Sequence, residues 1–206
     1  MNSTSQTFTG SEASLQKAKR WENSIIENGF YREHFFQQIV KEMSILSDGP
    51  LSILEVGSGP GHLAERVMKS IKVEKYALFD LSESMNYIAS QRLKNYQDVL
   101  EVNIGNFLNS KDYDNFTNVD VVVCMQTIHE AGDKKLAADI YECISKTLKP
   151  GGCFLVCDFI YDETSMNNST MYMTASEQKE LLLSSGFKSP ALVSLDNGLT
   201  LYKAYN

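Results

Sequence analysis

Apolar residues follow two alternating patterns along most of the chain. Short continuous apolar runs, which are typical of strands covered on both faces, alternate with segments whose apolar residues recur at helical spacing. The runs lie at residues 53–56, 75–80, 99–104, 119–125 and 153–159, and the helical patterns between them at residues 63–71, 81–93 and 136–148. This alternation predicts an α/β fold with a parallel sheet, in which residues 119–125 form a central strand.

The two ends of the chain add different elements. Residues 1–12 are polar and lack periodicity, which predicts a tail, and residues 13–26 and 35–46 have helical spacing. Near the other end, a capping box at residues 174–177 begins a helix that ends at Gly186. Asp196-Asn197-Gly198 between two apolar segments predicts a β-hairpin. We therefore expect a tail and helical cover over residues 1–48, and the main domain over residues 49–206.

Two connections in the second half of the chain are marked by their composition. Lys149-Pro150-Gly151-Gly152 is a combination that ends a helix, so the fifth strand is expected to begin at Cys153. Residues 158–172 are predicted to form a loop near the mouth of a site. The methionines of this loop are interpreted as gap-filling residues rather than as an acceptor pocket.

Gly57, Gly59 and Gly61 separate the first predicted strand from an amphipathic helix. Glycines at this place let the chain turn sharply and let its backbone approach a ligand, while the helix start offers unpaired N–H groups. The even spacing of the glycines differs from the dinucleotide fingerprint, and no lysine follows as in a phosphate loop. The pattern that does fit is Glu55-Val56-Gly57-Ser58-Gly59-Pro60-Gly61, with an acid on the strand itself.

This glycine loop resembles the first motif of the class I S-adenosylmethionine-dependent methyltransferases. The stretch FDLSESM resembles the second motif of that family, and LKPGG followed by a strand is a further likeness. The resemblance covers residues 51–206. It implies a Rossmann-like three-layer sandwich whose seven-stranded, mostly parallel sheet has an antiparallel terminal strand, S-adenosylmethionine as the cofactor, and N-terminal helices that cover the site.

The resemblance also implies a set of cofactor-binding residues. Glu55 and the loop residues Gly57, Ser58, Gly59 and Gly61 would hold the methionine part. The ribose and adenine would lie against Asp80, Leu81, Met85, Asn106 and Phe107, and Gln126 near the sulfonium. Asp80 also lies at a strand end about 20 residues past the loop, where a ribose-binding acid belongs. Two alternatives are that Asp80 only caps the next helix and that Asn106 is a turn residue.

Candidate acceptor residues lie in two regions. His129 follows the central strand, whose carboxyl end should face the site, and a histidine titrating near neutrality can take a proton from a hydroxyl group. The family resemblance points to the same role, whereas the alternative is a histidine that caps a helix or shapes the pocket. Trp21, Tyr31 and Phe35 are candidate wall residues of a lid. The alternative for these aromatic residues is simple packing of the helical cover on the sheet edge.

The composition of the chain limits which partners, cellular location and metal sites are expected. The 206 residues include 19 basic and 26 acidic ones, a formal charge of −7, which argues against a nucleic-acid binder that works by phosphate neutralisation. No apolar segment reaches the length of a membrane span or resembles a signal peptide, so we expect a cytoplasmic protein, monomeric or homodimeric, without a membrane partner. The four cysteines lie in apolar patterns and the three histidines are scattered, so we expect reduced thiols and no metal site.

The sequence therefore predicts an S-adenosylmethionine-dependent methyltransferase that acts on a small-molecule acceptor, with O-methylation favoured over N-methylation. A protein or peptide methyltransferase is a second reading, which the aromatic N-terminal helices disfavour. A third reading is a regulatory protein that binds the cofactor without transferring a methyl group. A nicotinamide-dependent oxidoreductase is opposed by the glycine spacing and the terminal hairpin.

Overall fold

The fold is built on one seven-stranded sheet with strand order β3-β2-β1-β4-β5-β7-β6. The computed structural model describes residues 8–29, 31–164 and 166–206. The strands are β1 (Leu51–Val56), β2 (Val73–Asp80), β3 (Leu100–Ile104), β4 (Val119–Met125), β5 (Leu148–Phe159), β6 (Lys188–Asp196) and β7 (Leu199–Tyr205). Within the described residues β7 runs antiparallel to both of its neighbours, and the pairings from β3 through to β5 are parallel. The predicted sheet is confirmed.

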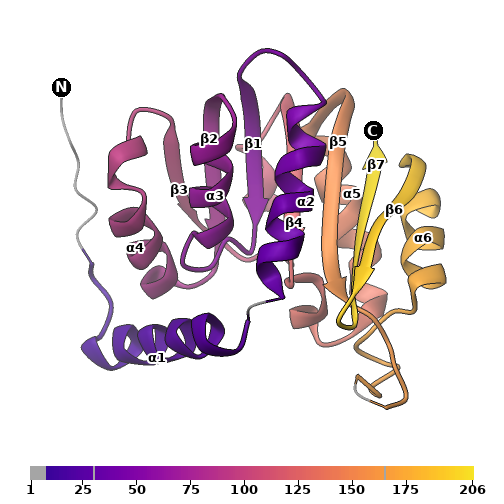
Figure 1. Ribbon diagram of the computed structural model, residues 1–206, viewed down its shortest axis with the longest axis horizontal. Coiled ribbons are helices and arrows are strands. Elements are labelled where there is room, and N and C mark those ends of the chain that lie inside the picture. The colour runs from indigo at the N-terminus through magenta and orange to yellow at the C-terminus, as the bar shows by residue number, and fades with distance from the viewer. Residues whose placement is uncertain (1–7, 30, 165) are drawn as a thin grey trace.

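Helices cover both faces of the sheet and give three layers (Figure 1). On one face α2 (Arg32–Ser44), α3 (His62–Ser70) and α4 (Glu83–Arg92) contribute buried side chains to one apolar cluster. On the other face α5 (Ala137–Thr147) and α6 (Ala175–Ser184) contribute to a second cluster. The capping box predicted for α6 is present, because Thr174 and Glu177 bond each other's backbone. In the part of the chain that the structure describes, no helix has the length and apolar character needed to cross a membrane.

Strand β4 lies in the middle of the sheet between β1 and β5. Its Val121, Val122 and Val123 are fully buried, which explains the continuous apolar run of this segment. The chain continues from β1 to β2 on one side of β1, while β4 pairs with the other side, so the strand order reverses between β1 and β4. Such a reversal leaves a crevice beyond the carboxyl ends of the strands, where ligands bind in open α/β sheets.

Helix α1 (Glu12–Asn28) lies across the carboxyl ends of the strands (Figure 1). Ser11 caps it by accepting the N–H of Ser14. Of the predicted tail, residues 1–7 lie outside the described part, but the rest packs on α4. The Thr9 N–H donates to Glu83 at 2.9 Å, and the Phe8 ring centroid lies 5.2 Å from that of Tyr87. The helix also begins one residue earlier than predicted, at Glu12, the last residue of the predicted tail.

Strand β5 begins earlier than the sequence predicts. Lys149-Pro150-Gly151-Gly152 lies within the strand, at an irregularity of register where Val119 pairs with Leu148 but Val121 pairs with Cys153. The backbone of Asn206 supplies partners there, because Gly151 N–H donates to its carbonyl at 3.2 Å and its own N–H donates to Gly152 at 2.9 Å. Proline is tolerated at such irregularities, so this motif ends α5 without ending the pairing.

The terminal hairpin of β6 and β7 is confirmed. Asn197 and Gly198 form its turn with φ angles of 47° and 74°, the left-handed conformation that a tight hairpin turn requires. Strand β6 extends from residue 188, so it is longer than the apolar segment that predicted it. As the edge of the sheet it is mostly exposed, which weakens its hydrophobic pattern.

The glycine loop passes close to the chain that follows β4, at the point where β1 ends. Gly57 has φ +71°, and a Cβ added there would meet Thr127 Oγ1 at 2.2 Å. Thr127 is buried, and its hydroxyl donates to the carbonyl of Val56 at 3.2 Å, so it has little freedom to move. By contrast Gly59, at φ +53°, faces open space within 4 Å. The two glycines therefore serve different needs.

We expect Gly57→Ala to lower the free energy of unfolding by about 3–5 kcal/mol, because a left-handed backbone and a collision with Thr127 add up. Gly59→Ala should cost only about 1–2 kcal/mol, the price of the left-handed backbone alone. Urea denaturation at neutral pH measures both. Equal losses in the two variants would contradict this account of the loop.

Candidate active site

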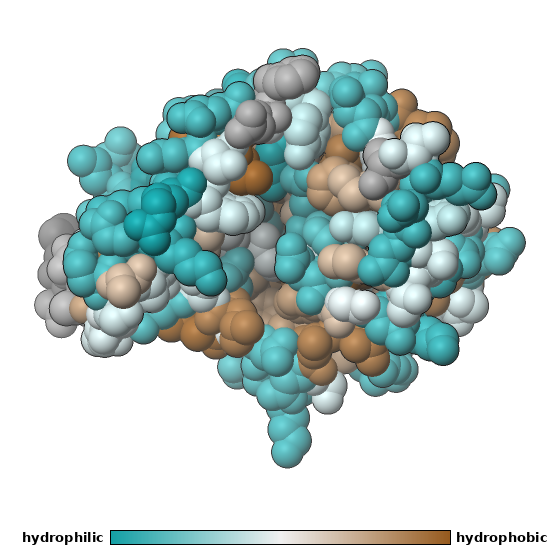
Figure 2. All heavy atoms as spheres, turned by 90° about the horizontal axis from the view of Figure 1, so that it is seen from below, coloured by the Kyte–Doolittle hydropathy of each residue, from teal (hydrophilic) through white to brown (hydrophobic). Residues whose placement is uncertain are grey.

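A cavity of about 490 Å³ lies at the carboxyl edge of the sheet. Figure 2 looks onto this edge and shows a hollow with apolar surface along part of its margin. The strand ends of β1, β2 and β4 form its floor, and α1 and the start of α2 contribute the covering side chains. The crevice expected from the strand order is therefore present and is large enough for a cofactor-sized ligand.

The glycine loop forms one wall of the cavity. Gly57, Ser58 and Gly59 line it, whereas Gly61 faces away, because a Cβ at Gly61 would meet the Ala89 side chain of α4 at 3.0 Å. Gly61 instead begins α3 as its N-cap residue. The Ser58 hydroxyl is buried and has no hydrogen-bond partner among the described residues. A ligand at this wall can therefore approach the backbone of Gly59 closely and can bond the Ser58 hydroxyl group.

Glu55 lies at the bottom of the cavity and is 3% exposed. The Tyr76 hydroxyl donates to its carboxylate at 2.7 Å. Burial raises the pKa of Glu55 to about 8, against the opposing hydrogen bond from Tyr76, and the charge of Asp80 raises it further while Arg32 lowers it. At neutral pH the free site therefore keeps this carboxyl largely protonated, and a cation placed beside it would favour ionisation.

Asp80 connects the glycine loop to the start of α4. Its carboxylate accepts the N–H groups of Gly59 and Ser82, each at 2.8 Å, and burial raises its pKa in spite of these bonds. The cap of α4 is Ser82, which accepts the Met85 N–H at 3.3 Å, so Asp80 is not the cap. Asp80 lines the cavity together with Leu81 and Met85, as predicted.

Asn106 does not line the cavity. Its side-chain oxygen accepts the Leu108 N–H at 3.0 Å and its own N–H donates to Asp112 at 2.7 Å, which is the arrangement of a turn residue. Its side-chain oxygen thus already accepts one hydrogen bond within the loop, and the predicted contact of Asn106 with a ligand stays a prediction. Phe107 does line the cavity.

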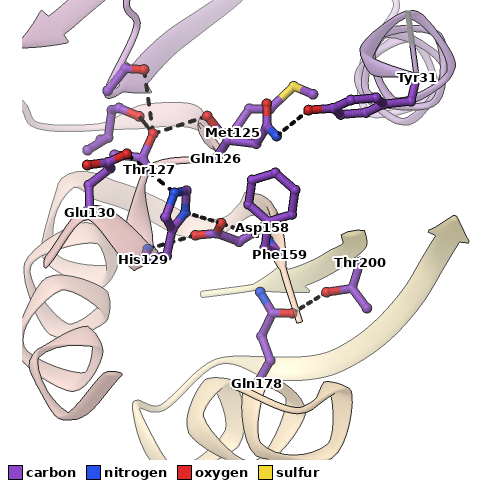
Figure 3. A network of polar contacts seen from close by, with 12 residues as sticks. Tyr31, Met125, Gln126, Thr127, His129, Glu130, Asp158, Phe159, Gln178 and Thr200 are labelled. Atoms are coloured by element: carbon purple, nitrogen blue, oxygen red, sulfur yellow. Dashed lines mark hydrogen bonds and ion pairs between the residues drawn. The ribbon is translucent and has the colours of Figure 1, made fainter. Parts of the chain in front are cut away.

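His129 and Asp158 form a buried pair at the ends of neighbouring strands β4 and β5 (Figure 3). Asp158 Oδ1 accepts from His129 Nδ1 at 2.6 Å, and Oδ2 accepts the backbone N–H of His129 at 3.0 Å. The Phe159 N–H donates to the same carboxylate at 2.8 Å. Because a carboxylate only accepts, Nδ1 carries hydrogen and Nε2 remains for a ligand.

The electrostatics of His129 follow from this pairing. Burial alone lowers the pKa of His129, but the hydrogen bond and charge of Asp158, assisted by Glu130, outweigh it and raise the pKa above the usual 6.5. Glu130 Oε1 lies 3.4 Å from Nε2, and its side chain is 68% exposed. The histidine lines the cavity, and its role there stays a prediction.

Gln126 stands between the strand end and α2. It adopts a left-handed backbone with φ 54°, unusual for a residue with a side chain. Its amide nitrogen donates to the Tyr31 hydroxyl at 3.2 Å (Figure 3), while its amide oxygen is buried without a partner among the described residues. Both residues line the cavity. A strained backbone at a site of this kind points to a functional constraint.

The predicted aromatic wall is partly wrong. Trp21, which is 44% exposed, and Tyr31 line the cavity, but Phe35 is fully buried in the core between α2 and the sheet. Phe35, Ile39 and Met43 follow one another at intervals of four residues and face the sheet together. The neighbouring Phe36 is rotated away from that face and lines the cavity instead.

Arg32 and Asp158 are among the residues of the site that were not predicted from the sequence. Arg32, in the first turn of α2, lines the cavity near enough to Glu55 for the two charges to interact. Burial lowers its pKa, and its Nε atom has no partner among the described residues. Asp158 was read as the end of the fifth strand and the start of a loop, without a role in the site. The available signal was its place near the end of β5, whose neighbour β4 is followed closely by a histidine.

These residues fit a ligand with an amino-acid end and a nucleoside end. A buried acid and a partly buried arginine suit an ammonium and a carboxylate group, while Ser58 leaves a hydroxyl group and Gly59 leaves space beside them. Asp80 at the end of β2 suits a pair of ribose hydroxyls, and Phe107 and Met85 offer apolar surface to a flat ring. The polar groups of the cavity are therefore those that would bind a nucleoside carrying an amino acid.

The chain is similar to known proteins. Residues 54–154 match the family model described as a methyltransferase domain. The chain is 22% identical over 183 residues to the (RS)-norcoclaurine 6-O-methyltransferase of Thalictrum flavum subsp. glaucum, a match that covers 81% of this chain and 49% of that enzyme. The chain therefore spans about half the length of this curated relative.

Two solved structures have the same fold. A SAM-dependent methyltransferase from Aquifex aeolicus superimposes with a TM-score of 0.70 at 17% identity, covering 93% of this chain and 97% of the other. The human N-acetylserotonin methyltransferase in complex with SAM gives 0.66 at 20% identity, covering 94% and 55%. The match identifies residues 54–154 as resembling a methyltransferase domain, and the two solved structures show that the chain has the fold of S-adenosylmethionine-dependent methyltransferases.

Proposed function

We propose that this chain transfers the methyl group of S-adenosylmethionine to a hydroxyl oxygen of a small molecule. The observation that carries the proposal is the His129–Asp158 pair in the cavity. A hydroxyl acceptor needs a proton removed as it attacks, and a histidine fixed by a carboxylate is suited to that task. The likeness to an O-methyltransferase supports the same acceptor class.

The cofactor supplies a methyl group on a good leaving group, so the chain's own task is to bind and align the reactants. In the proposed arrangement Glu55 receives the ammonium group and Arg32 the carboxylate of the amino-acid end. Asp80 accepts the ribose hydroxyls while it keeps its bond to Gly59. Gln126 lies near the sulfonium, on the acceptor side of the cofactor, and Phe107 lies against the adenine ring.

His129 then acts at a defined atom. Asp158 holds the Nδ1 hydrogen, which leaves the lone pair of Nε2 for the proton of the acceptor hydroxyl. Asp158 also fixes the backbone at His129, so the ring is held at both ends. The resulting imidazolium is stabilised by the neighbouring carboxylate, which lies in a largely water-free setting.

A small and largely apolar acceptor suits the rest of the cavity. Trp21, Tyr31, Phe36 and Phe159 offer aromatic surface on several sides of the acceptor space. Helix α1 lies across the carboxyl edge and restricts the approach of a folded protein (Figure 1). We therefore favour a small hydroxylated aromatic compound over a protein or peptide side chain.

We expect His129→Gln to lower the turnover of the accepted hydroxyl compound by about 10²- to 10⁴-fold. The affinity for S-adenosylhomocysteine should stay within about 3-fold, because His129 serves the acceptor. Asp158→Asn should also lower turnover, and it should shift the acidic limb of kcat/KM to lower pH. The reason is that Asp158 raises the pKa of His129, whose neutral form is active, so activity falls as pH drops through that pKa.

Radiometric methyl transfer against pH, and calorimetric titration with S-adenosylhomocysteine, measure these effects. Glu130→Gln is the matched control, because Glu130 also contacts His129 but is exposed, and it should change turnover by less than about 5-fold. Full activity of His129→Gln with the same acceptor would remove the base from the mechanism.

Glu55→Gln should make the free protein more stable in alkaline solution. In the wild type the folded state binds more protons than the unfolded state between pH 4.5 and about 8, so the free energy of unfolding falls as pH rises through this window. Glutamine keeps an oxygen for Tyr76 and removes the titration. We expect a gain on the order of 2–4 kcal/mol at pH 8.

The same variant should bind S-adenosylhomocysteine more weakly. Wild-type affinity should rise between pH 6 and pH 8, because the charge of the ligand ammonium favours ionised Glu55 and binding therefore releases the Glu55 proton to solvent, and this rise should be absent in Glu55→Gln. Urea denaturation at several pH values and calorimetry in two buffers of different ionisation enthalpy give both readouts. An unchanged affinity would exclude Glu55 from the cofactor site.

A further inference from the structure

A second polar cluster lies at the outer side of the glycine loop, where α1, α3 and α4 meet. Arg92, the last residue of α4, donates from Nε to the carbonyl of Pro60 in the loop at 2.9 Å. Its Nη1 lies 3.3 Å from Glu65 on α3, and its Nη2 donates to Glu22 on α1. One guanidinium group therefore joins the loop to two helices.

Glu22 depends on Arg92 for its charge balance. Glu22 is 9% exposed, so this pair is not a solvated surface contact. His62 Nε2 also lies 3.3 Å from Glu22, but burial first and Arg92 second lower the pKa of His62, which keeps it neutral near pH 7. The other charged groups that act on His62 are Arg32 and Glu65. Arg92 is thus the cation that directly contacts Glu22 in this cluster.

The cluster lies beside the part of α1 that covers the cavity. Trp21 and Ile25, one residue before and three residues after Glu22, both line the cavity. The first half of α1 is held separately, by buried Leu15 and Ala18 and by the Ser14–Ser84 hydroxyl contact at 2.9 Å. The second half has Glu22 as its buried polar anchor. The Glu22–Arg92 contact therefore lies beside the two residues of α1 that line the cavity.

We propose that Glu22 and Arg92 are positioning residues that fix the covering helix α1 to the glycine loop, so that cofactor binding and the seating of α1 stabilise each other. The inference rests on the proposed function only in taking S-adenosylmethionine as the ligand of the loop. A ligand that fixes the loop fixes the Pro60 carbonyl and with it Arg92. Because such coupling is reciprocal, a seated α1 also strengthens ligand binding.

The test is amide hydrogen exchange of the full chain with and without S-adenosylhomocysteine, combined with calorimetry. In the wild type the ligand should slow exchange in residues 20–28 by about 5-fold or more, the usual lower size of such coupling. In Glu22→Gln the slowing should fall below about 2-fold, and the Kd for S-adenosylhomocysteine should rise by about 5-fold or more. Arg92→Lys keeps the charge but not the forked geometry, and it should weaken ligand binding as well.

Glu33→Gln is the matched control. Glu33 also pairs with an arginine of α3, Arg66, but both side chains are more than 40% exposed and neither lines the cavity. This variant should behave as the wild type. Ligand-dependent slowing that persists in Glu22→Gln, or that is absent from the wild type, overturns the inference. Failure of the wild type to bind S-adenosylhomocysteine is a separate result, which overturns the cofactor proposal and the inference with it.

Discussion

The crossing of the glycine loop beneath Thr127 is the constraint on which the site depends. The backbone at Gly57 passes so close to the chain after β4 that no side chain fits, and the parallel pairing of β1 with β4 fixes that distance. Asp80 then holds the next part of the loop through Gly59, and the pairing of β1 with β2 places Asp80 there. Three strands thus determine where the loop lies. Any ligand that uses the loop is positioned by sheet register rather than by flexible side chains.

The cavity carries electrostatic cost that the rest of the fold offsets. Burial raises the pKa of Glu55 and of Asp80 and lowers the pKa of Arg32, so it disfavours the charged form of each residue. Gln126 adds a left-handed backbone that an ordinary strand end does not need. Each feature lowers the stability of the free protein and becomes favourable only with a charged, hydrogen-bonding ligand in place. The two apolar clusters on the faces of the sheet supply the stability that tolerates this.

The parts predicted from the sequence are those set by local spacing. Buried strands, the glycine loop, Asp80 at a strand end and His129 after β4 each follow from residues close together in the chain. The parts that were missed depend on contacts between distant segments. Asp158 meets His129 across 29 positions, and Arg32 reaches Glu55 from another helix. Phe35 and Phe36 differ by one helical step, which decides between core and cavity, and a pattern with adjacent aromatic residues does not resolve that step.

The way α1 is held explains why a covering helix can also admit ligands. Its second half joins the glycine loop through a charged contact, and in its middle only a few side chains reach the apolar interior. Apolar burial is lost in full when a helix lifts, whereas charged groups released to water regain hydration, which offsets part of the contact that they give up. A cover fixed by packing alone would stay shut, and a cover with no anchor would leave the aromatic wall undefined. An ionic anchor shared with the cofactor loop gives a cover that opens at modest cost and is placed accurately when the loop is occupied.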